Sequence, residues 1–136
     1  MVVLERAVRF DDVDAAGIVF FGTIVAYVHE AMEHFFEQLE GGYARLIIER
    51  RVGVPAVKLE ADFSAPLRYG DRMRIETSVA RVGKRSAELV YRILRVRDGV
   101  VCASLRHTVV VTDLDALVSC DMPADVRAAL EAHLSG

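Results

Sequence analysis

The chain has 136 residues, of which 53% are hydrophobic and 27% charged, so it has the size and composition of one folded domain. The formal net charge of −3 argues against nonspecific nucleic-acid binding, which needs a strongly basic surface. No window approaches the roughly 20 apolar residues of a membrane span, and residues 1–10 lack the apolar core of a signal peptide. We therefore expect a single cytoplasmic domain over residues 1–136, with no nucleic-acid partner and no membrane insertion.

The first half of the chain predicts a strand over residues 2–10, a loop over residues 11–17 and one long helix. The helix spans about residues 23–39, where apolar side chains recur at helical spacing: Ile24, Val28, Met32, Phe35 and Leu39. We expect Ile24, Val28 and Phe35 to face the core, and Gly41-Gly42 to end the helix.

Beyond residue 53 the apolar period changes to two, which predicts strands. Residues 57–64 and 72–79 alternate between apolar and polar side chains, so each strand is expected to bury one face. Residues 86–96 and 100–112 are apolar on two faces, which predicts a central place in the sheet. The Asp98-Gly99 pair between them is a strong hairpin signal.

A short terminal helix is predicted after Asp121 and Pro123. The order of strand, long helix, four strands and small helix predicts an α+β fold, with one helix packed on a five-stranded antiparallel sheet. One helix cannot cover both faces of such a sheet. The apolar strands therefore also suggest burial against a partner subunit.

Several residue types with possible chemistry form no recognisable site. His29 and His34 are five residues apart, about 140° around a helix, whereas the helical zinc pattern needs spacing of four. We therefore predict no metal site and a polar helix face, with a role for His29 or Glu30 near the active site left open. His107 lies mid-strand and is expected to be a satisfied or sheet-facing histidine rather than a base.

The thiols and hydroxyls give no nucleophile motif. Cys102 and Cys120 have neither CxxC spacing nor a Cys/His cluster, so they are expected to be reduced thiols. The chain has no GxSxG nucleophile motif. The basic turn at Lys84, Arg85 and Ser86 is either a phosphate site or a solvated hairpin turn.

The most informative segment is residues 10–21, which places three carboxylates, a glycine and an apolar run just before the long helix. Asp12 and Asp14 could simply accept backbone N–H bonds in the loop. However, Gly17 allows close approach of the backbone, and residues 18–21 provide a water-poor wall. Exposed N–H groups at the helix start can also bind a developing oxyanion.

Phe10-Asp-Asp-Val-Asp-Ala-Ala-Gly-Ile-Val-Phe-Phe resembles the signature of hotdog-fold acyl-CoA thioesterases of the 4-hydroxybenzoyl-CoA thioesterase and YbgC type. Residues 63–71 and the basic turn at residues 84–86 resemble further family segments. The resemblance covers residues 4–130. It implies a hotdog fold, in which a long helix is wrapped by a five-stranded antiparallel sheet.

The resemblance also implies a site. Asp14 corresponds to the family's catalytic carboxylate, which acts as nucleophile or general base. The backbone N–H near Phe21 corresponds to the family's oxyanion donor. Lys84, Arg85 and Ser86 fall where family members contact coenzyme A, which is part of the substrate and the only cofactor-like group implied. Active sites of the family lie at dimer interfaces, so we expect a homodimer or dimer of dimers, with residues 55–59 of the other chain, Val57 included, lining the pocket.

Two departures bear on the substrate. Phe21 stands where a histidine is frequent, which argues against a histidine-assisted mechanism. His29 replaces an acidic residue, which weakens the case for a phenol contact and for a 4-hydroxybenzoyl substrate. Phe20, Phe21 and Ile24 favour an apolar aliphatic or aromatic acyl group, and Gly17 is a further candidate for substrate binding.

Two alternatives remain open. One is a thioesterase acting on an acyl carrier protein, as in polyketide or fatty-acid off-loading. The other is a non-catalytic acyl-CoA binding module, which has no need of Asp14.

Overall fold

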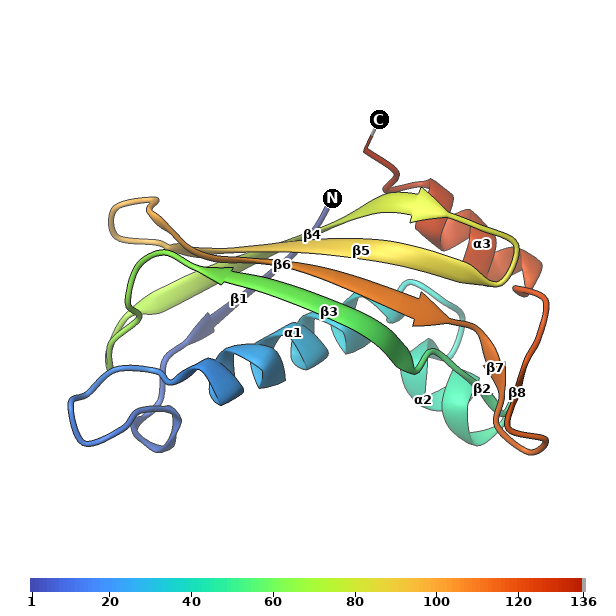
Figure 1. Cartoon of the computed structure of the whole chain (residues 1–136), viewed down its shortest axis with the longest axis horizontal. Helices are drawn as coiled ribbons and strands as arrows, with labels where there is room; N and C mark the ends of the chain where they lie inside the picture. The colour runs from blue at the N-terminus through green and yellow to red at the C-terminus, as the bar shows by residue number, and fades with distance from the viewer. Residues whose placement is uncertain (136) are drawn as a thin grey trace.

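The computed structural model, which describes residues 1–135, is a curved antiparallel sheet with a long helix along one face (Figure 1). The sheet has the strand order β1-β4-β5-β6-β3. Its strands are β1 (Val2–Ala7), β3 (Ala56–Phe63), β4 (Arg72–Val82), β5 (Ser86–Arg95) and β6 (Val101–Val110). The helix is α1 (Phe21–Phe36). The predicted α+β fold, a long helix wrapped by a five-stranded antiparallel sheet, is confirmed.

Smaller elements gather at one end of the sheet (Figure 1). They are helices α2 (Gly42–Ile48) and α3 (Ala124–Glu131), and a three-stranded sheet of β2 (Val52–Gly53), β7 (Thr112–Asp113) and β8 (Val118–Ser119). The terminal helix was predicted, whereas α2 and the small sheet were not. Among residues 1–135, no helix combines the length and the apolar character that crossing a bilayer requires.

Two predicted boundaries were wrong. The first strand ends at Ala7, and Phe10–Asp12 form a 3₁₀ turn because the Arg9 N–H donates to the Asp12 carboxylate at 2.8 Å. The helix ends at Phe36, several residues before the glycine pair. Gly41, with φ of +78°, instead precedes α2 in a left-handed conformation that glycine adopts without strain.

The core lies between α1 and the inner face of the sheet. Ile24, Val28 and Phe35 are buried there, as predicted. They meet buried side chains of the three central strands: Met73, Ile75, Leu89, Tyr91, Ile93 and Leu105. Burial of this apolar area is the main favourable contribution to folding.

The outer face of the sheet is charged. Arg92 on β5 pairs with Glu76 on β4 at 3.4 Å, and Arg106 on β6 pairs with Glu88 on β5. β5 and β6 do occupy the predicted inner positions of the sheet. The prediction of two apolar faces was wrong, because outward-facing charged residues interrupt the apolar pattern of both strands.

β3 forms a free edge of the main sheet, and all eight of its residues are exposed. The helix packs chiefly against β1 and β4, so the far edge of the sheet extends beyond it. Leu59 and Phe63, on the inner face of β3, are consequently 40% and 53% exposed. One face of this strand was predicted to be buried, but the rest of the same chain does not cover it.

Candidate active site

Asp14 lies in a tight loop that holds its carboxylate by backbone hydrogen bonds. The Asp14 N–H donates to the Ile18 carbonyl at 3.0 Å, and Gly17, with φ of +75°, permits the turn. The Ala16 and Ile18 N–H groups donate to Asp14 Oδ1 at 2.9 and 3.2 Å. Within residues 1–135, Oδ2 accepts no hydrogen bond. The exposed side chain therefore has one fixed oxygen and one available oxygen.

A half-buried ion cluster anchors this loop to the fold. The Arg6 guanidinium pairs with Asp12 at 2.9 Å and with Glu30 on α1, and it lies 4.4 Å from the centre of the Tyr27 ring. Burial, reinforced by the neighbouring Asp12 carboxylate, raises the pKa of Tyr27. Asp12 therefore shapes the loop, as expected. Glu30 has a structural partner in Arg6.

The start of α1 offers unpaired donors. The Thr23 and Ile24 N–H groups already donate to the Phe20 carbonyl, at 3.1 and 3.3 Å. The Phe21 and Gly22 N–H groups have no acceptor in the part of the chain that the structure describes, and no side chain caps this end. Free N–H groups at a helix start carry partial positive charge, so they suit an oxyanion.

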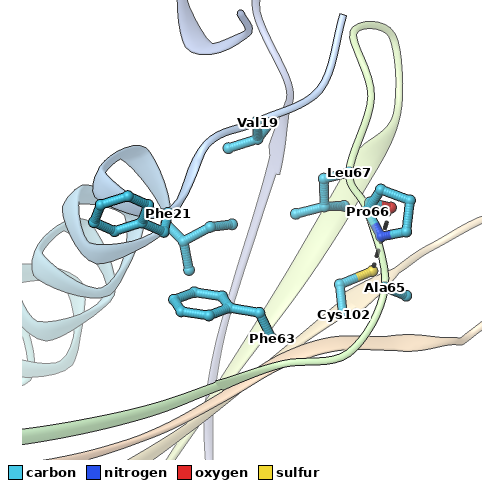
Figure 2. Close-up of a pocket in the computed structure, with 8 residues that line it drawn as sticks. Val19, Phe21, Phe63, Ala65, Pro66, Leu67 and Cys102 are labelled. Carbon is cyan, nitrogen blue, oxygen red and sulfur yellow. Dashed lines mark hydrogen bonds between the residues drawn. The ribbon is translucent and has the colours of Figure 1, made fainter. Parts of the chain in front are cut away.

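An apolar cavity of about 440 Å³ opens beside the helix start. In Figure 2, Phe21 and Phe63 lie on one side of it, and Pro66 and Leu67 on the other. The lining comes from the segment before α1, α1 itself, the end of β3, the residues that follow β3, and β6: Val19, Phe21, Ile24, Phe63, Ala65, Pro66, Leu67 and Cys102. Ile24, a predicted substrate-binding residue, therefore lines this cavity.

Asp14 lines a second cavity, of about 420 Å³, with Phe10, Val13, Ala15, Gly17 and Tyr69. The Phe10 and Tyr69 rings meet edge to face at 5.6 Å and are 79% and 58% exposed. Gly17 lines this cavity, and Val19 lines the first. The cavity that contains the Asp14 carboxylate and the apolar cavity are therefore both bordered by residues 17–19.

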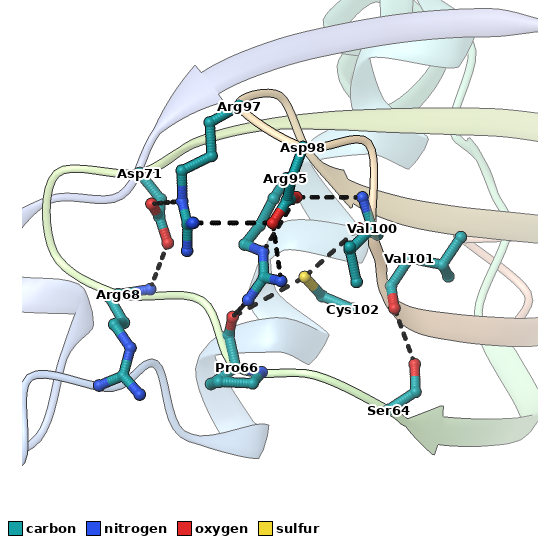
Figure 3. Close-up of polar contacts among 10 residues, drawn as sticks. All are labelled: Ser64, Pro66, Arg68, Asp71, Arg95, Arg97, Asp98, Val100, Val101 and Cys102. Carbon is teal, nitrogen blue, oxygen red and sulfur yellow. Dashed lines mark hydrogen bonds and ion pairs between the residues drawn. The ribbon is translucent and has the colours of Figure 1, made fainter.

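The wall of the first cavity is fixed by a polar cluster, shown in Figure 3. Arg95 donates to the Pro66 carbonyl at 2.9 Å and pairs with Asp98 at 3.0 Å. Partial burial alone would raise the pKa of Asp71, but its bonds to the Arg68 amide and the Arg97 guanidinium hold that pKa below its usual value. The segment between β3 and β4 is therefore rigidly held.

Cys102 contributes an apolar wall rather than a reactive thiol. It is buried, and its Sγ lies 3.6 Å from the Val100 carbonyl oxygen. Burial raises the pKa of its thiol, which disfavours the nucleophilic thiolate. Both Cys102 and Cys120 are free cysteines.

Other predicted site residues line neither of the two cavities. The Phe20 ring is half exposed and packs edge-on to Phe21 at 6.4 Å, while Val57 is exposed on β3. His29 is exposed on α1, 3.8 Å from Glu33. Neither His29 nor Val57 lines either cavity.

The basic turn at residues 84–86 lies at the opposite end of the sheet from Asp14 (Figure 1). The Tyr69 N–H donates to the Gly17 carbonyl at 3.2 Å, so the Asp14 loop lies near the start of β4. The basic turn follows the end of this 11-residue strand, about 35 Å away. Arg85 there pairs with Asp121 at 2.9 Å. One chain does not bring the two regions together.

The two helix histidines have separate neighbours. His34 Nε2 lies 3.2 Å from the Val3 carbonyl oxygen, whereas His29 lies beside Glu33. Within residues 1–135, no group of three metal-ligating side chains gathers.

Sequence reasoning missed the far wall of the apolar cavity and the anchoring cluster. Phe63 and Pro66 belong to a segment whose family resemblance was visible, but nothing local showed that it faces α1. Arg6 and Glu30 are 24 residues apart, and no periodicity links them.

Comparisons with known proteins show the family to which the chain belongs. The family model of the thioesterase-like superfamily matches residues 8–130. A 1,4-dihydroxy-2-naphthoyl-CoA hydrolase of Prochlorococcus marinus is 31% identical over 137 residues, covering 95% of this chain and 86% of the relative.

Solved structures give the same result. A gentisyl-coenzyme A thioesterase is 32% identical with a TM-score of 0.83, over 94% of this chain and 98% of that one. A 1,4-dihydroxy-2-naphthoyl-CoA thioesterase from Synechocystis is 25% identical with a TM-score of 0.84, over 94% and 93% of the two chains. The chain therefore belongs to the thioesterase-like superfamily of hotdog-fold enzymes.

Proposed function

We propose that this chain hydrolyses an acyl-CoA thioester, with Asp14 as the nucleophile or as the base that activates water. The observation that carries the proposal is the Asp14 carboxylate, fixed through Oδ1 and free at Oδ2, on the loop that leads into the unpaired N–H groups of α1. A thioester is activated and has a good leaving group, so a modest carboxylate suffices.

Both versions of the reaction use the same groups. Asp14 Oδ2, or a water that it deprotonates, adds to the thioester carbonyl carbon, and the oxyanion is received by the Phe21 N–H with the adjacent Gly22 N–H. The carbon–sulfur bond then breaks and coenzyme A leaves as a thiolate. If Asp14 is the nucleophile, water hydrolyses the resulting anhydride in a second step. Neither route calls for a further cofactor.

The free edge of β3 supports a homodimer. An exposed strand edge presents unpaired backbone groups, and the inner side chains Leu59 and Phe63 add apolar surface beside it. If β3 paired antiparallel with β3 of a second copy, opposite ends of the two sheets would lie beside each other. The partner's basic turn would then move toward the Asp14 end of this chain, and its Val57 toward the α1 surface.

We expect Leu59→Arg to convert the dimer to a monomer and to lower kcat/KM about tenfold, because a charge at the centre of an apolar interface is costly to bury. Sedimentation velocity measures the first effect, and release of coenzyme A the second. Asp62→Asn, on the outer face of the same strand, is the control. A wild-type protein that is monomeric and active would contradict the dimer.

The basic turn is expected to bind the phosphates of coenzyme A. Lys84 is exposed and forms no ion pair within residues 1–135, so its removal should leave the fold unchanged. We expect Lys84→Ala to raise KM for an acyl-CoA about tenfold with kcat unchanged, since it removes a phosphate contact.

The control substrate is the same acyl group on N-acetylcysteamine, which lacks phosphates and should be indifferent to Lys84→Ala. Arg92→Ala, at an exposed arginine that pairs with Glu76 on the outer face of the sheet, is the control variant. Turnover of an acyl carrier protein thioester without turnover of the acyl-CoA would favour the carrier-protein alternative. Tight acyl-CoA binding without release of coenzyme A would favour a binding module.

A further inference from the structure

One buried side chain of α1 has a polar atom without a partner. Tyr27 is 0% exposed, and among residues 1–135 its hydroxyl oxygen is the only buried side-chain oxygen or nitrogen that forms no hydrogen bond. Buried polar atoms in native proteins nearly always have a partner, and an exception calls for a physical explanation. We therefore looked for an acceptor that this hydroxyl meets in another state of the protein.

The Asp12 carboxylate is the candidate acceptor. The Arg6 guanidinium lies 4.4 Å from the centre of the Tyr27 ring and donates to Asp12 Oδ2 at 2.9 Å, so the ring and the carboxylate contact the same cation. Asp12 Oδ2 also accepts the Arg9 N–H, whereas Oδ1 accepts no hydrogen bond from the described residues. Burial and the Asp12 carboxylate raise the pKa of Tyr27, so its hydroxyl keeps the proton that it would donate.

Asp12 determines where the Asp14 loop lies. Its bond with the Arg9 N–H, at 2.8 Å, closes the 3₁₀ turn that precedes the loop. The next residue, Val13, pairs with Val19 in an antiparallel bridge, and Asp14 follows directly in the chain. A shift of the Asp12 carboxylate is therefore transmitted to Asp14 through a short, hydrogen-bonded backbone.

Tyr27 connects this loop to the other half of the proposed site. It follows Phe21 by six residues, about 9 Å along α1 from the unpaired N–H groups at the helix start. Glu30, on the same helix, also pairs with Arg6. The distance from the Asp14 carboxylate to these N–H groups depends on how the loop and the helix are held together. A displacement of about 1 Å in an active site lowers the rate about a hundredfold.

We propose that Tyr27 is a positioning residue, whose hydroxyl donates to Asp12 Oδ1 when an acyl-CoA is bound. This bond sets the Asp14 carboxylate against the N–H groups at the start of α1, and the inference rests on the proposed function. A substrate that contacts both the loop and the helix draws them together, and active-site hydrogen bonds that are long in the free enzyme commonly tighten in its complex. Because Tyr27 is fully buried, it acts through Asp12 and not by touching the substrate.

The decisive variant is Tyr27→Phe, which removes only the hydroxyl. Because this hydroxyl is unpaired in the free protein, we expect Tm to stay within about 3 °C of wild type or to rise. For the faster substrate of benzoyl-CoA and hexanoyl-CoA, we expect kcat to fall about tenfold or more with KM within about threefold, because the energy of the bond is used to orient the loop. Thermal melts and release of coenzyme A measure these effects.

The matched control is Tyr91→Phe, which removes the same atom from a partnered hydroxyl. Tyr91 is fully buried on β5, and its hydroxyl oxygen lies 3.0 Å from Nδ1 of His107. This variant should lower Tm by more than about 3 °C, because it also leaves the buried His107 nitrogen unpaired, and should keep kcat within about twofold of wild type.

Two kinetic or thermal outcomes overturn the proposal. If Tyr27→Phe lowers Tm as much as Tyr91→Phe does, the hydroxyl already has a partner in the free protein and its role is structural. If Tyr27→Phe keeps kcat close to that of wild type, the hydroxyl does not position Asp14. An inactive Asp14→Asn variant beside a fully active Tyr27→Phe variant would remove this inference and leave the thioesterase proposal standing.

A second measurement uses the wild-type protein and needs no turnover. Carbon-13 NMR of protein labelled at tyrosine Cζ reports the hydrogen bonding of each hydroxyl. Saturating S-hexyl-CoA, a thioether that cannot be hydrolysed, should move the Tyr27 resonance, and an unmoved resonance in the complex overturns the bond to Asp12. A moved resonance in a protein that hydrolyses no acyl-CoA would leave the contact standing while removing the thioesterase proposal.

Discussion

Replacing Asp14 by Asn is expected to lower kcat for acyl-CoA hydrolysis by about 10²–10⁴-fold, the range contributed by a general base. The asparagine Oδ1 still accepts the Ala16 and Ile18 N–H bonds, so the loop should keep its shape. The amide nitrogen that takes the place of Oδ2 neither attacks a carbonyl nor accepts a proton. Release of coenzyme A under saturating substrate measures the effect.

The matched control is Asp11→Asn, which makes the same chemical change in the same segment. Asp11 is exposed, and its side chain makes no hydrogen bond within residues 1–135, so its variant should retain wild-type turnover. Asp14→Ala differs because it also removes both loop bonds. If Asp14→Asn keeps kcat within threefold of wild type, the carboxylate has no role in the chemistry.

Replacing Arg6 by Met is expected to lower the free energy of unfolding by about 3 kcal/mol, since breaking a buried ion pair leaves its partner charge uncompensated. The Arg6 and Asp12 side chains are only 11% and 13% exposed, and the change also removes the cation over the Tyr27 ring. For a chain of this length the corresponding fall in Tm is about 10 °C. Denaturant titration and thermal melts measure both quantities.

Arg92→Met is the control, because that arginine is 54% exposed and pairs on the outer face of the sheet. A surface pair of this kind contributes about 0–1 kcal/mol, so the control should be close to wild type. Equal effects of the two substitutions would show that the Arg6 cluster contributes no more than a surface ion pair. Because Asp12 also bonds the Arg9 amide, the Arg6 variant should lose activity along with stability.

Periodicity predicted the long elements well because it reports which face of each element is buried. The apolar residues of α1 and the alternation along β4 gave both the type and the orientation of these elements correctly. α2 has seven residues, too few for a stable isolated helix, so tertiary packing and not local sequence determines it.

The candidate site, like the fold, has parts that the sequence predicts and parts that it does not. Asp14 and the helix start could be proposed from the sequence because they are contiguous in a recognisable motif. The contacts of Arg6 with the Tyr27 ring and with Asp12 depend on how α1 packs on β1, which the period of neither element specifies. The exposure of β3 escaped prediction because alternation shows that a strand has an apolar face, but not which chain covers it.

That exposed strand has a consequence for how the enzyme behaves on dilution. If β3 is covered only by a second copy, the folded monomer has an uncovered strand edge and associates readily. Specific activity should then fall as the protein concentration drops below the dissociation constant of the dimer. Charged side chains on its outer face, such as Lys58 and Glu60, oppose indiscriminate edge-to-edge growth. In the proposed dimer, catalytic output would then also depend on the cellular abundance of the chain.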